Sequence, residues 1–156
     1  MGSELPEMRL KAIGTVRSEF NNPHRKENGE KTDFDQMVSE IVIDPELSEA
    51  LDGLDGFSHI IVLYWIHRHR PGKAPTRVHP RGNRAKPLTG LFATRSPHRP
   101  NPIGKATVRL LRRQANRLTV EGLDAIDGTP VLDIKPYIPG YDSAEDARVP
   151  SWMTRP

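Results

Sequence analysis

Residues 59–66 read HIIVLYWI, and this stretch contains the longest apolar run of the chain, residues 60–66. A continuous apolar run of this length, rich in β-branched and aromatic residues, is typical of a β-strand that is buried on both faces. The run is far too short to cross a lipid bilayer as a helix. The stretch therefore predicts a central strand, and the other elements can be placed around it.

Shorter segments on both sides of this run also have the periodicity of strands. The candidate strands are residues 9–16, 36–43, 88–94, 106–111, 117–126 and 130–134. The last two are joined around Asp127-Gly128, a pair typical of a tight turn. Many short strands separated by regular turns favour a mainly β fold, either a β-barrel or a strongly curved sheet.

One short helix is marked between the second candidate strand and the central run. Asp44 can cap it, Pro45 suits its first position, and Gly53 suits its exit. The spacing predicts one apolar stripe that faces the core. The members of the stripe are Leu47, Ala50, Leu51 and Leu54.

The composition limits the class of protein. The chain has 156 residues, which suits one domain with a core of its own. It has no cysteine, so disulfide scaffolds, thiolate catalysis and cysteine-based zinc sites are excluded. Residues 1–10 are short and polar and do not resemble a secretory signal. We therefore expect a soluble, cytoplasmic protein without a membrane segment.

Charge is distributed unevenly along the chain. Residues 57–119 contain no Asp or Glu, yet they hold fourteen of the 23 Lys and Arg residues and five of the six His residues. Such segregation favours a polyanionic partner, and nucleic acid is the first candidate. A solvated basic surface without a partner is the alternative.

The stretch 91–104, LFATRSPHRPNPIG, places two arginines on a backbone that prolines make stiff. A rigid backbone lowers the entropic cost of binding, and Arg95 and Arg99 can each hold a carboxylate or a phosphate. A structural, proline-rich crossover with solvated arginines is the alternative.

Four stretches of the sequence resemble the TrmO/TsaA-like family. They are IGTVRSEF (13–20), LDGFSHIIVLYWIH (54–67), FATRSPHRPNPIG (92–104) and LDAIDGTPVLDIKPYIP (123–139). The resemblance implies a single-sheet β-barrel with one short helix and long loops. It also implies S-adenosylmethionine as cofactor and a homodimer with the cofactor near the interface. The characterised activity methylates the exocyclic N6 of a threonylcarbamoyladenosine at position 37, beside the anticodon of tRNA. We expect this domain at residues 8–142 and a tail at 143–156.

The resemblance also implies which residues contact the cofactor. They are Pro23, His24, Arg25, His67, Arg68, Arg95, Lys105, Glu121, Gly122, Leu123 and Asp124. The chemistry agrees in outline, because a cofactor carboxylate suits an arginine and ribose hydroxyls suit Asp124. Backbone groups near Gly122 and Leu123 suit an adenine.

Longer bacterial members carry a further C-terminal domain thought to help hold tRNA. We expect the basic loop 68–87 to supply that grip here through phosphate contacts. The candidate RNA-binding residues are Arg70, Lys73, Arg77, Arg81, Arg84, Lys86 and Arg99.

His67 is the first candidate for the base that removes a proton from the target nitrogen, because histidine exchanges protons readily near neutral pH. Asp133 and Tyr137 are the other candidates, and a cofactor or packing contact is the alternative role for His67.

A metal cluster of His67, His69, His79 and His98 is disfavoured, because no carboxylate is near in sequence and the basic setting repels cations. We expect no metal. Methylation of another nucleoside or a small metabolite, and a non-catalytic module that binds RNA or cofactor, are the alternative functions.

Overall fold

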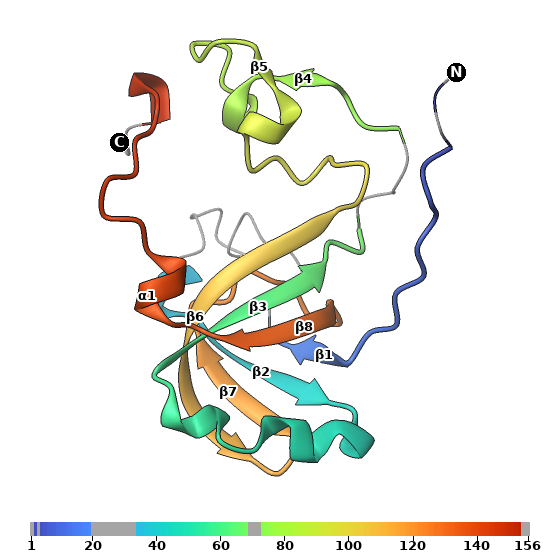
Figure 1. Ribbon diagram of the computed structural model, residues 1–156, viewed down its shortest axis with the longest axis vertical. Coiled ribbons are helices and arrows are strands. Elements are labelled where there is room, and N and C mark those ends of the chain that lie inside the picture. The colour runs from blue at the N-terminus through green and yellow to red at the C-terminus, as the bar shows by residue number, and fades with distance from the viewer. Residues whose placement is uncertain (1, 3, 20–33, 69–72, 154–156) are drawn as a thin grey trace.

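The computed structural model describes residues 2, 4–19, 34–68 and 73–153, and Figure 1 shows a β-barrel below a smaller lobe. Six antiparallel strands close the barrel in the order β1-β2-β7-β6-β3-β8. They are β1 (Gly14–Arg17), β2 (Val38–Ile43), β3 (His59–Trp65), β6 (Ile103–Gln114), β7 (Arg117–Glu121) and β8 (Pro130–Pro136). The expected mainly β, single-sheet barrel is confirmed.

Strand β3 is the central element that the apolar run predicted. It pairs with β6 on one side and with β8 on the other. Ile60, Val62 and Tyr64 point into the barrel and belong to the hydrophobic core. On the outer face Ile61 is also buried, whereas Trp65 is half-buried. The strand is therefore covered fully on its inner face and partly on its outer face.

The alternating strand directions divide the barrel into two ends. Strands β1, β3 and β7 run toward one end, and their antiparallel neighbours β2, β6 and β8 start from it. The connection 66–102, the connection 122–129, and both ends of the connection from β1 to β2 therefore lie at this end. We call it the loop end, and in Figure 1 it faces the lobe.

A short helix follows β2 at the opposite end, as expected, but it is a 3₁₀ helix, η2 (Pro45–Leu51). Asp44 caps it, since its Oδ1 accepts a 3.0 Å hydrogen bond from the backbone N–H of Glu46. Gly53 follows with φ of 84°, which favours glycine, and a second turn, η3 (Leu54–Gly56), leads into β3.

The expected apolar stripe of this helix is only half right. Leu51 is buried and Leu54 packs against the core. Leu47 and Ala50 are exposed. A 3₁₀ helix has three residues per turn, so residues at a spacing of three lie above one another. Ser48 therefore shares a face with Leu51, whereas Leu54 lies in the next turn, η3, and the α-helical spacing placed Leu47 and Ala50 on the wrong face.

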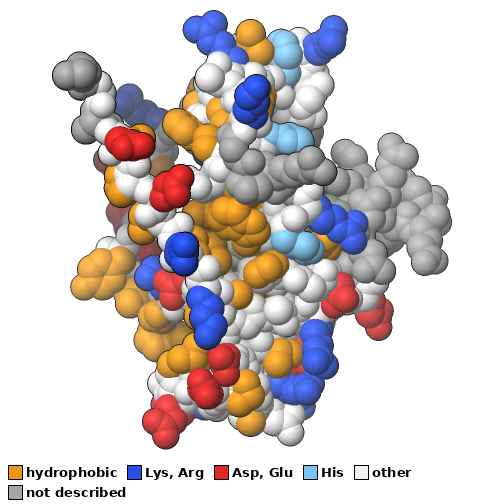
Figure 2. Space-filling view, turned by 90° about the vertical axis from the view of Figure 1, so that its right-hand side faces the viewer, with side chains coloured by type: hydrophobic (Ala, Val, Ile, Leu, Met, Phe, Trp, Pro, Cys, Tyr) orange, Lys and Arg blue, Asp and Glu red, His pale blue; other side chains and the backbone are white. Residues whose placement is uncertain are grey.

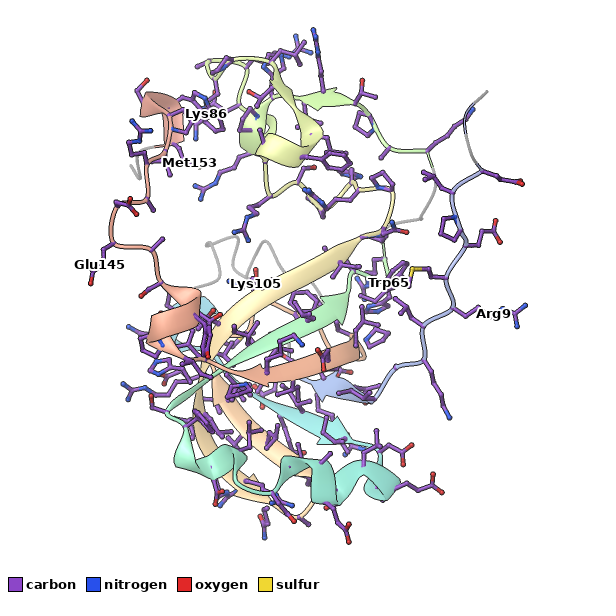
Figure 3. The ribbon with its side chains drawn as sticks, in the orientation of Figure 1. Arg9, Trp65, Lys86, Lys105, Glu145 and Met153 are labelled. Carbon is purple, nitrogen blue, oxygen red and sulfur yellow. The ribbon has the colours of Figure 1, made fainter. Side chains whose placement is uncertain are left out.

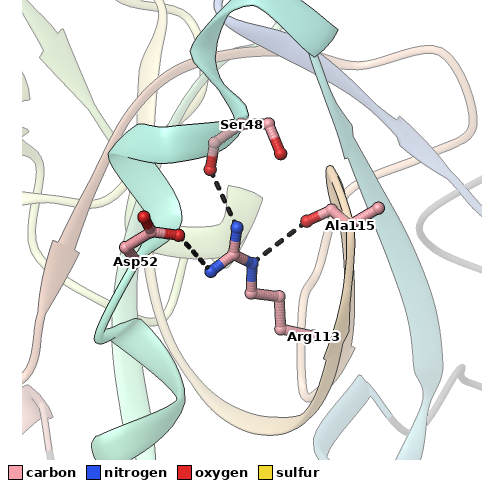
Figure 4. A network of polar contacts seen from close by, with 4 residues as sticks. All are labelled: Ser48, Asp52, Arg113 and Ala115. Carbon is pink, nitrogen blue, oxygen red and sulfur yellow. Dashed lines mark hydrogen bonds and ion pairs between the residues drawn. The ribbon is translucent and has the colours of Figure 1, made fainter.

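Arg113 fastens this helical end to the hairpin between β6 and β7 (Figure 4). Its guanidinium pairs with Asp52 at 2.8 Å and donates to the carbonyl oxygens of Ser48, at 2.9 Å, and Ala115, at 3.0 Å. Two segments distant in sequence, the end of η2 and the β6–β7 hairpin, are thus held together by one side chain. Arg113 belongs to the acid-free segment, yet its charge is matched here by an acid from outside that segment.

The expected strand at residues 88–94 is wrong. Only β5 (Thr89–Gly90) is extended there, paired with β4 (Arg77–Val78), and a 3₁₀ turn, η5 (Leu91–Ala93), follows. The Thr94 hydroxyl donates to the Leu91 carbonyl at 2.7 Å and stabilises the turn. A local side-chain hydrogen bond thus replaces the ladder that the strand would need.

The remaining short helices are η1 (Phe34–Gln36), η4 (Pro80–Gly82), α1 (Pro139–Asp142) and η6 (Ser151–Met153). No helix in the described ranges has the length and apolar character needed to cross a membrane.

Candidate functional site

The loop end gathers most of the expected cofactor residues, although they are far apart in sequence. His67 and Arg68 follow β3, Lys105 lies on the upper part of β6 (Figure 3), and Arg95 lies on the connection between these strands. Residues 121–124 follow from β7 at the same end. Pro23, His24 and Arg25 lie outside the described residues. The barrel topology therefore collects the described candidates on one face.

Tyr64 joins two of these segments. Its side chain is 6% exposed, and its hydroxyl donates a 2.6 Å hydrogen bond to Oδ1 of Asp124. Asp124 itself is exposed, so its carboxylate contacts the Tyr64 hydroxyl on one side and solvent on the other. Burial, the charge of Asp124 and the hydrogen bond together raise the pKa of Tyr64 well above its ordinary value. Tyr64 is thus a permanent donor to Asp124.

Gly104 provides the room for this tyrosine. The two residues are cross-strand partners, and a Cβ atom at position 104 would lie 2.4 Å from the Tyr64 ring. The neighbouring Pro102 is buried, and its carbonyl accepts a 2.7 Å hydrogen bond from the N–H of Ile66. The PNPIG stretch therefore forms the seat of the Tyr64 ring beside the loop end.

The segment after β7 buries the side chains of Leu123 and Ala125 and exposes that of Asp124 between them. Gly122 has φ of 97° and donates its N–H to the Met37 carbonyl at 2.9 Å. Leu123 is fully buried in the core. Any ligand contact of Leu123 must therefore use its backbone, in agreement with the expectation that backbone groups here suit an adenine.

Arg99 is tied into its own loop. Its Nη1 donates to the carbonyl oxygens of Thr94, at 2.9 Å, and Ser96, at 3.3 Å. The guanidinium carbon lies 5.6 Å from the centre of the Phe92 ring. Arg95, in contrast, is exposed. The stiff loop thus uses one arginine to hold its shape and presents the other to solvent.

Residues 73–88 form a folded basic lobe rather than an open loop. The ring Nδ1 of His79 lies 2.9 Å from the Lys86 carbonyl, and the N–H of Ala85 donates to the side chain of Asn83 at 2.9 Å. Figure 2 shows Lys and Arg side chains at the top of the molecule, over this lobe. Exposed members are Lys73, Arg77, Arg81 and Arg84, with Lys86 half-buried; Arg70 lies outside the described residues.

The three candidate bases are not brought together. His67 is exposed just past the end of β3. Tyr137 packs edge-on against His59 at the start of that strand, with ring centres 6.3 Å apart. The seven residues of β3 separate these two ends by about 20 Å. A substrate bound beside His67 within one subunit would not reach Tyr137.

Asp133 lies on β8 opposite Leu63 and forms an ion pair with Lys135, at 2.8 Å. The hydrogen bond and the charge of Asp133 raise the pKa of Lys135. The Asp133 carboxylate thus already has an ion-pair partner, and the pair lies on the outer wall of the barrel. Of the three candidates, only His67 lies at the loop end itself.

One buried polar atom marks the inside of the barrel near this end. Ser39 is the second residue of β2 and is 5% exposed, and its hydroxyl is the one buried side-chain polar atom in the described ranges without a partner. Buried polar groups normally have a hydrogen-bond partner, so the Ser39 hydroxyl is available to hydrogen-bond with a bound ligand. Within the same ranges, no three metal-ligating side chains gather.

The donor set at the loop end fits S-adenosylmethionine. Arg68 and Arg95 are exposed cations suited to a carboxylate, and the open oxygen of the Asp124 carboxylate suits a pair of ribose hydroxyls. Tyr64 was missed by sequence reasoning. The only signal for it is a hydroxyl within an otherwise apolar strand.

Comparison with known proteins identifies relatives along most of the chain. The family described as tRNA-methyltransferase O N-terminal domain matches residues 15–143. A probable S-adenosyl-L-methionine-binding protein of Methanothermobacter thermautotrophicus is 47% identical over 137 residues, covering 88% of this chain and 95% of that protein. A tRNA (adenine(37)-N6)-methyltransferase of Homo sapiens is 45% identical over 102 residues, covering 65% of this chain and 23% of that protein.

Solved structures agree with these matches. The crystal structure of TrmO from Pseudomonas aeruginosa superposes with a TM-score of 0.72 at 36% identity, covering 93% of this chain and 62% of that chain. The chain thus spans about three-fifths of the crystallised relative and about a quarter of the human one. The family match, the identities and the barrel agree with the resemblance that the four sequence motifs carry. The chain therefore belongs to the family of tRNA-methyltransferase O N-terminal domains.

Proposed function

We propose that this protein is an S-adenosylmethionine-dependent methyltransferase that acts on the exocyclic N6 of threonylcarbamoyladenosine at position 37 of tRNA. The observation that carries the proposal is the Asp124 carboxylate, held by Tyr64 at the loop end of the barrel where the candidate cofactor residues converge. The names of the human and archaeal relatives support the activity and the cofactor, respectively.

The cofactor would lie across the loop end. Arg95 and Arg68 would bind its carboxylate, and Asp124 would accept hydrogen bonds from its ribose hydroxyls. The backbone at Gly122 and Leu123 would face its adenine. When bound, the cofactor supplies an electrophilic methyl group on a sulfonium. The protein would then have to place the target nitrogen in line with that group and remove its proton.

We assign removal of this proton to His67, because His67 lies at the loop end and histidine is the side chain best suited to proton exchange near neutral pH. The imidazole of His67 would accept the proton of the target nitrogen as that nitrogen takes up the methyl group that the cofactor would supply. Asp133 and Tyr137 stay alternatives that the geometry favours less.

The basic lobe would hold the tRNA backbone. The lobe that carries these exposed residues lies on the same side of the barrel as the loop end (Figure 1), which suits a substrate that must reach both. Phosphate contacts of this kind position RNA without reading its sequence. A homodimer with the cofactor near its interface, and a cytoplasmic location, are parts of the same proposal.

A different substrate is the competing proposal. The Methanothermobacter relative, which matches this chain almost end to end, is named only for cofactor binding. Methylation of another nucleoside or a small metabolite would use the same cofactor site without the basic lobe. A module that binds RNA or cofactor without catalysis would use the site without His67.

Calorimetric titration with S-adenosylmethionine tests the cofactor site. We expect binding to the wild type and its loss in Arg95→Ala, whereas Arg112→Ala, an exposed arginine on the lower part of β6, should bind normally. Absence of binding to the folded wild type would refute the proposal.

Methyl transfer to two tRNA preparations, one with threonylcarbamoyladenosine and one with plain adenosine at position 37, tests the substrate. Mass spectrometry of the nucleosides should show the methylated product from the first preparation alone. Product from neither preparation, in a protein that binds the cofactor, would favour the competing substrates.

A further inference from the structure

Phe92 is exposed to a degree that a structural phenylalanine does not need. It lies on η5, directly after β5, and it is 79% exposed. Its neighbour Leu91 is 5% exposed and anchors the same turn. The turn therefore buries one apolar side chain and holds the next one out into solvent.

The ring is held in place from below. The Arg99 guanidinium lies 5.6 Å from the ring centre, within the range of a cation–π contact. The same guanidinium is fixed by hydrogen bonds to the carbonyls of Thr94 and Ser96. One face of the ring is thus occupied by a fixed arginine, and the high exposure of Phe92 leaves its other face open.

The turn that carries the ring is itself rigid. The Leu91 N–H donates to the Thr76 carbonyl at 2.9 Å, and the Thr94 hydroxyl closes the turn on Leu91. The Arg99 N–H donates to the Pro97 carbonyl at 2.9 Å, within a proline-rich run. A ring held this way loses little conformational entropy when a ligand stacks on it.

The positive charges in this part of the chain favour an anionic ligand. No Asp or Glu occurs in residues 57–119, and the exposed side chains around this part of the chain include Arg77, Arg81, Arg84 and Arg95. An aromatic ring among cations is the combination by which proteins bind single-stranded nucleic acid, with bases on the ring and phosphates on the cations. An acidic peptide would use the cations but has no planar group for the ring.

We infer that Phe92, backed by Arg99, is a stacking platform for an unpaired RNA base. The inference rests on the proposed function, because an unpaired base is what the anticodon loop of a tRNA offers. It goes further, since it assigns a base contact to a residue outside the candidate cofactor site. Arg99 acts as a positioning residue that supports the ring. The platform binds any of the four bases, because stacking does not depend on which base is present.

Binding of two RNA oligomers of equal length, oligoadenylate and its abasic counterpart, separates stacking from phosphate contacts. Both carry the same charge, but only the first has bases. We expect the wild type to prefer oligoadenylate, and Phe92→Leu to weaken that binding about tenfold, the order of one base–aromatic stack, without changing abasic binding. Phe57→Leu, a partly exposed phenylalanine at the opposite end of the barrel, should change neither.

Salt provides a second signature. Because stacking releases no counterions, Phe92→Leu should lower oligoadenylate affinity by the same factor at low and high salt. In Phe92→Trp, the added tryptophan should be quenched by oligoadenylate and not by the abasic oligomer. Equal loss of affinity for both oligomers in Phe92→Leu would overturn the inference.

Further results separate the proposals. If Phe92→Leu and the wild type differ in oligomeric state in sedimentation velocity, the ring belongs to a contact between copies of the chain, and the platform is refuted. If the wild type transfers no methyl group to tRNA but keeps base-dependent, Phe92-dependent binding, the proposed function fails and the platform stands. If methyl transfer is active but Phe92→Leu leaves oligoadenylate binding unchanged, the platform fails and the proposed function stands.

Discussion

The hydroxyl of Tyr64 donates a 2.6 Å hydrogen bond to Asp124, 60 residues further along the chain, and so ties the central strand to the segment after β7. Removing the hydroxyl in Tyr64→Phe keeps the ring against Gly104 but frees the carboxylate. Hydrogen bonds to charged groups contribute about 1.5–3 kcal/mol when buried, and the exposure of Asp124 reduces this value. We expect the Kd for S-adenosylmethionine to rise about three- to tenfold in calorimetry.

Tyr141→Phe is the matched control for this variant, because Tyr141 is 86% exposed on α1 and the substitution removes a hydroxyl at the surface. Its Kd should equal that of the wild type. Equal affinities of the wild type and Tyr64→Phe would show that the Asp124 carboxylate does not contact the cofactor or does not need its anchor.

The same hydroxyl should make folding sensitive to alkaline pH. The pKa of Tyr64 is raised in the folded protein, so the native state keeps its proton while the unfolded chain ionises above the ordinary pKa of about 10. The stabilisation is complete below that pH and is lost as pH rises above it, by up to about 1.4 kcal/mol per pH unit. Urea unfolding between pH 9 and pH 11 should show this slope.

Tyr64→Phe should remove this slope and leave the remaining pH dependence unchanged. The free energies of unfolding of the two proteins should therefore approach each other as pH rises. Parallel curves for the two proteins across this range would contradict a buried, protonated Tyr64.

Gly104→Ala tests the seat of the tyrosine ring. The new methyl group would lie 2.4 Å from the ring, so the ring must move away. Overpacking of this kind costs about 1–3 kcal/mol, and displacement of Tyr64 should also weaken cofactor binding. Gly90→Ala is the control, because nothing lies within 4 Å of a Cβ atom there and its φ of −54° suits alanine.

A double variant identifies the cause of the Gly104→Ala effect. In the Tyr64→Ala background the clash is absent, so Gly104→Ala should cost much less than in the wild type. Additive losses in denaturant unfolding would mean that Gly104 is needed for a reason other than the ring.

The barrel could be predicted from the sequence because its strands are short and separated by turns, and because β3 stands out as a continuous apolar run. The local forms of the connections could not. Residues 88–94 have the composition of a strand, but Thr94 bonds to Leu91 and closes a turn instead. Residues 45–51 have helical caps, but the helix is 3₁₀, so the α-helical spacing put Leu47 on the wrong face. Such choices depend on contacts that periodicity does not encode.

Site residues could be predicted from the sequence only where they lie in the motifs that resemble the family. Asp124 could be expected from its motif, whereas its anchor Tyr64 could not, because their pairing depends on strand register. Charge counting also overstated the basic surface. Arg113 pairs with Asp52 and Arg117 with Glu40, at 2.9 Å, so their charges are partly matched within the folded chain.

Arg113→Ala should destabilise the fold without affecting the site. Its guanidinium loses two backbone carbonyl contacts and one ion pair, and the carbonyls of Ser48 and Ala115 lose a donor. We expect a loss of about 1–3 kcal/mol in denaturant unfolding. Asp52→Asn should cost less than about 1 kcal/mol, since its side chain is 70% exposed. A larger cost for Asp52→Asn than for Arg113→Ala would contradict the dominance of the backbone contacts.

Arg84→Gln tests whether the basic lobe binds RNA through phosphates. Arg84 is exposed on the lobe, so its loss should remove about one phosphate contact and weaken binding to all RNA sequences alike. The slope of log K against log salt concentration should become shallower by about one unit. Arg112→Gln is the matched control, an exposed arginine from the same acid-free segment but on the lower part of β6. Equal changes of slope in both variants would mean that the RNA contacts the barrel wall as well as the lobe, and an unchanged slope in Arg84→Gln would contradict phosphate binding by the lobe.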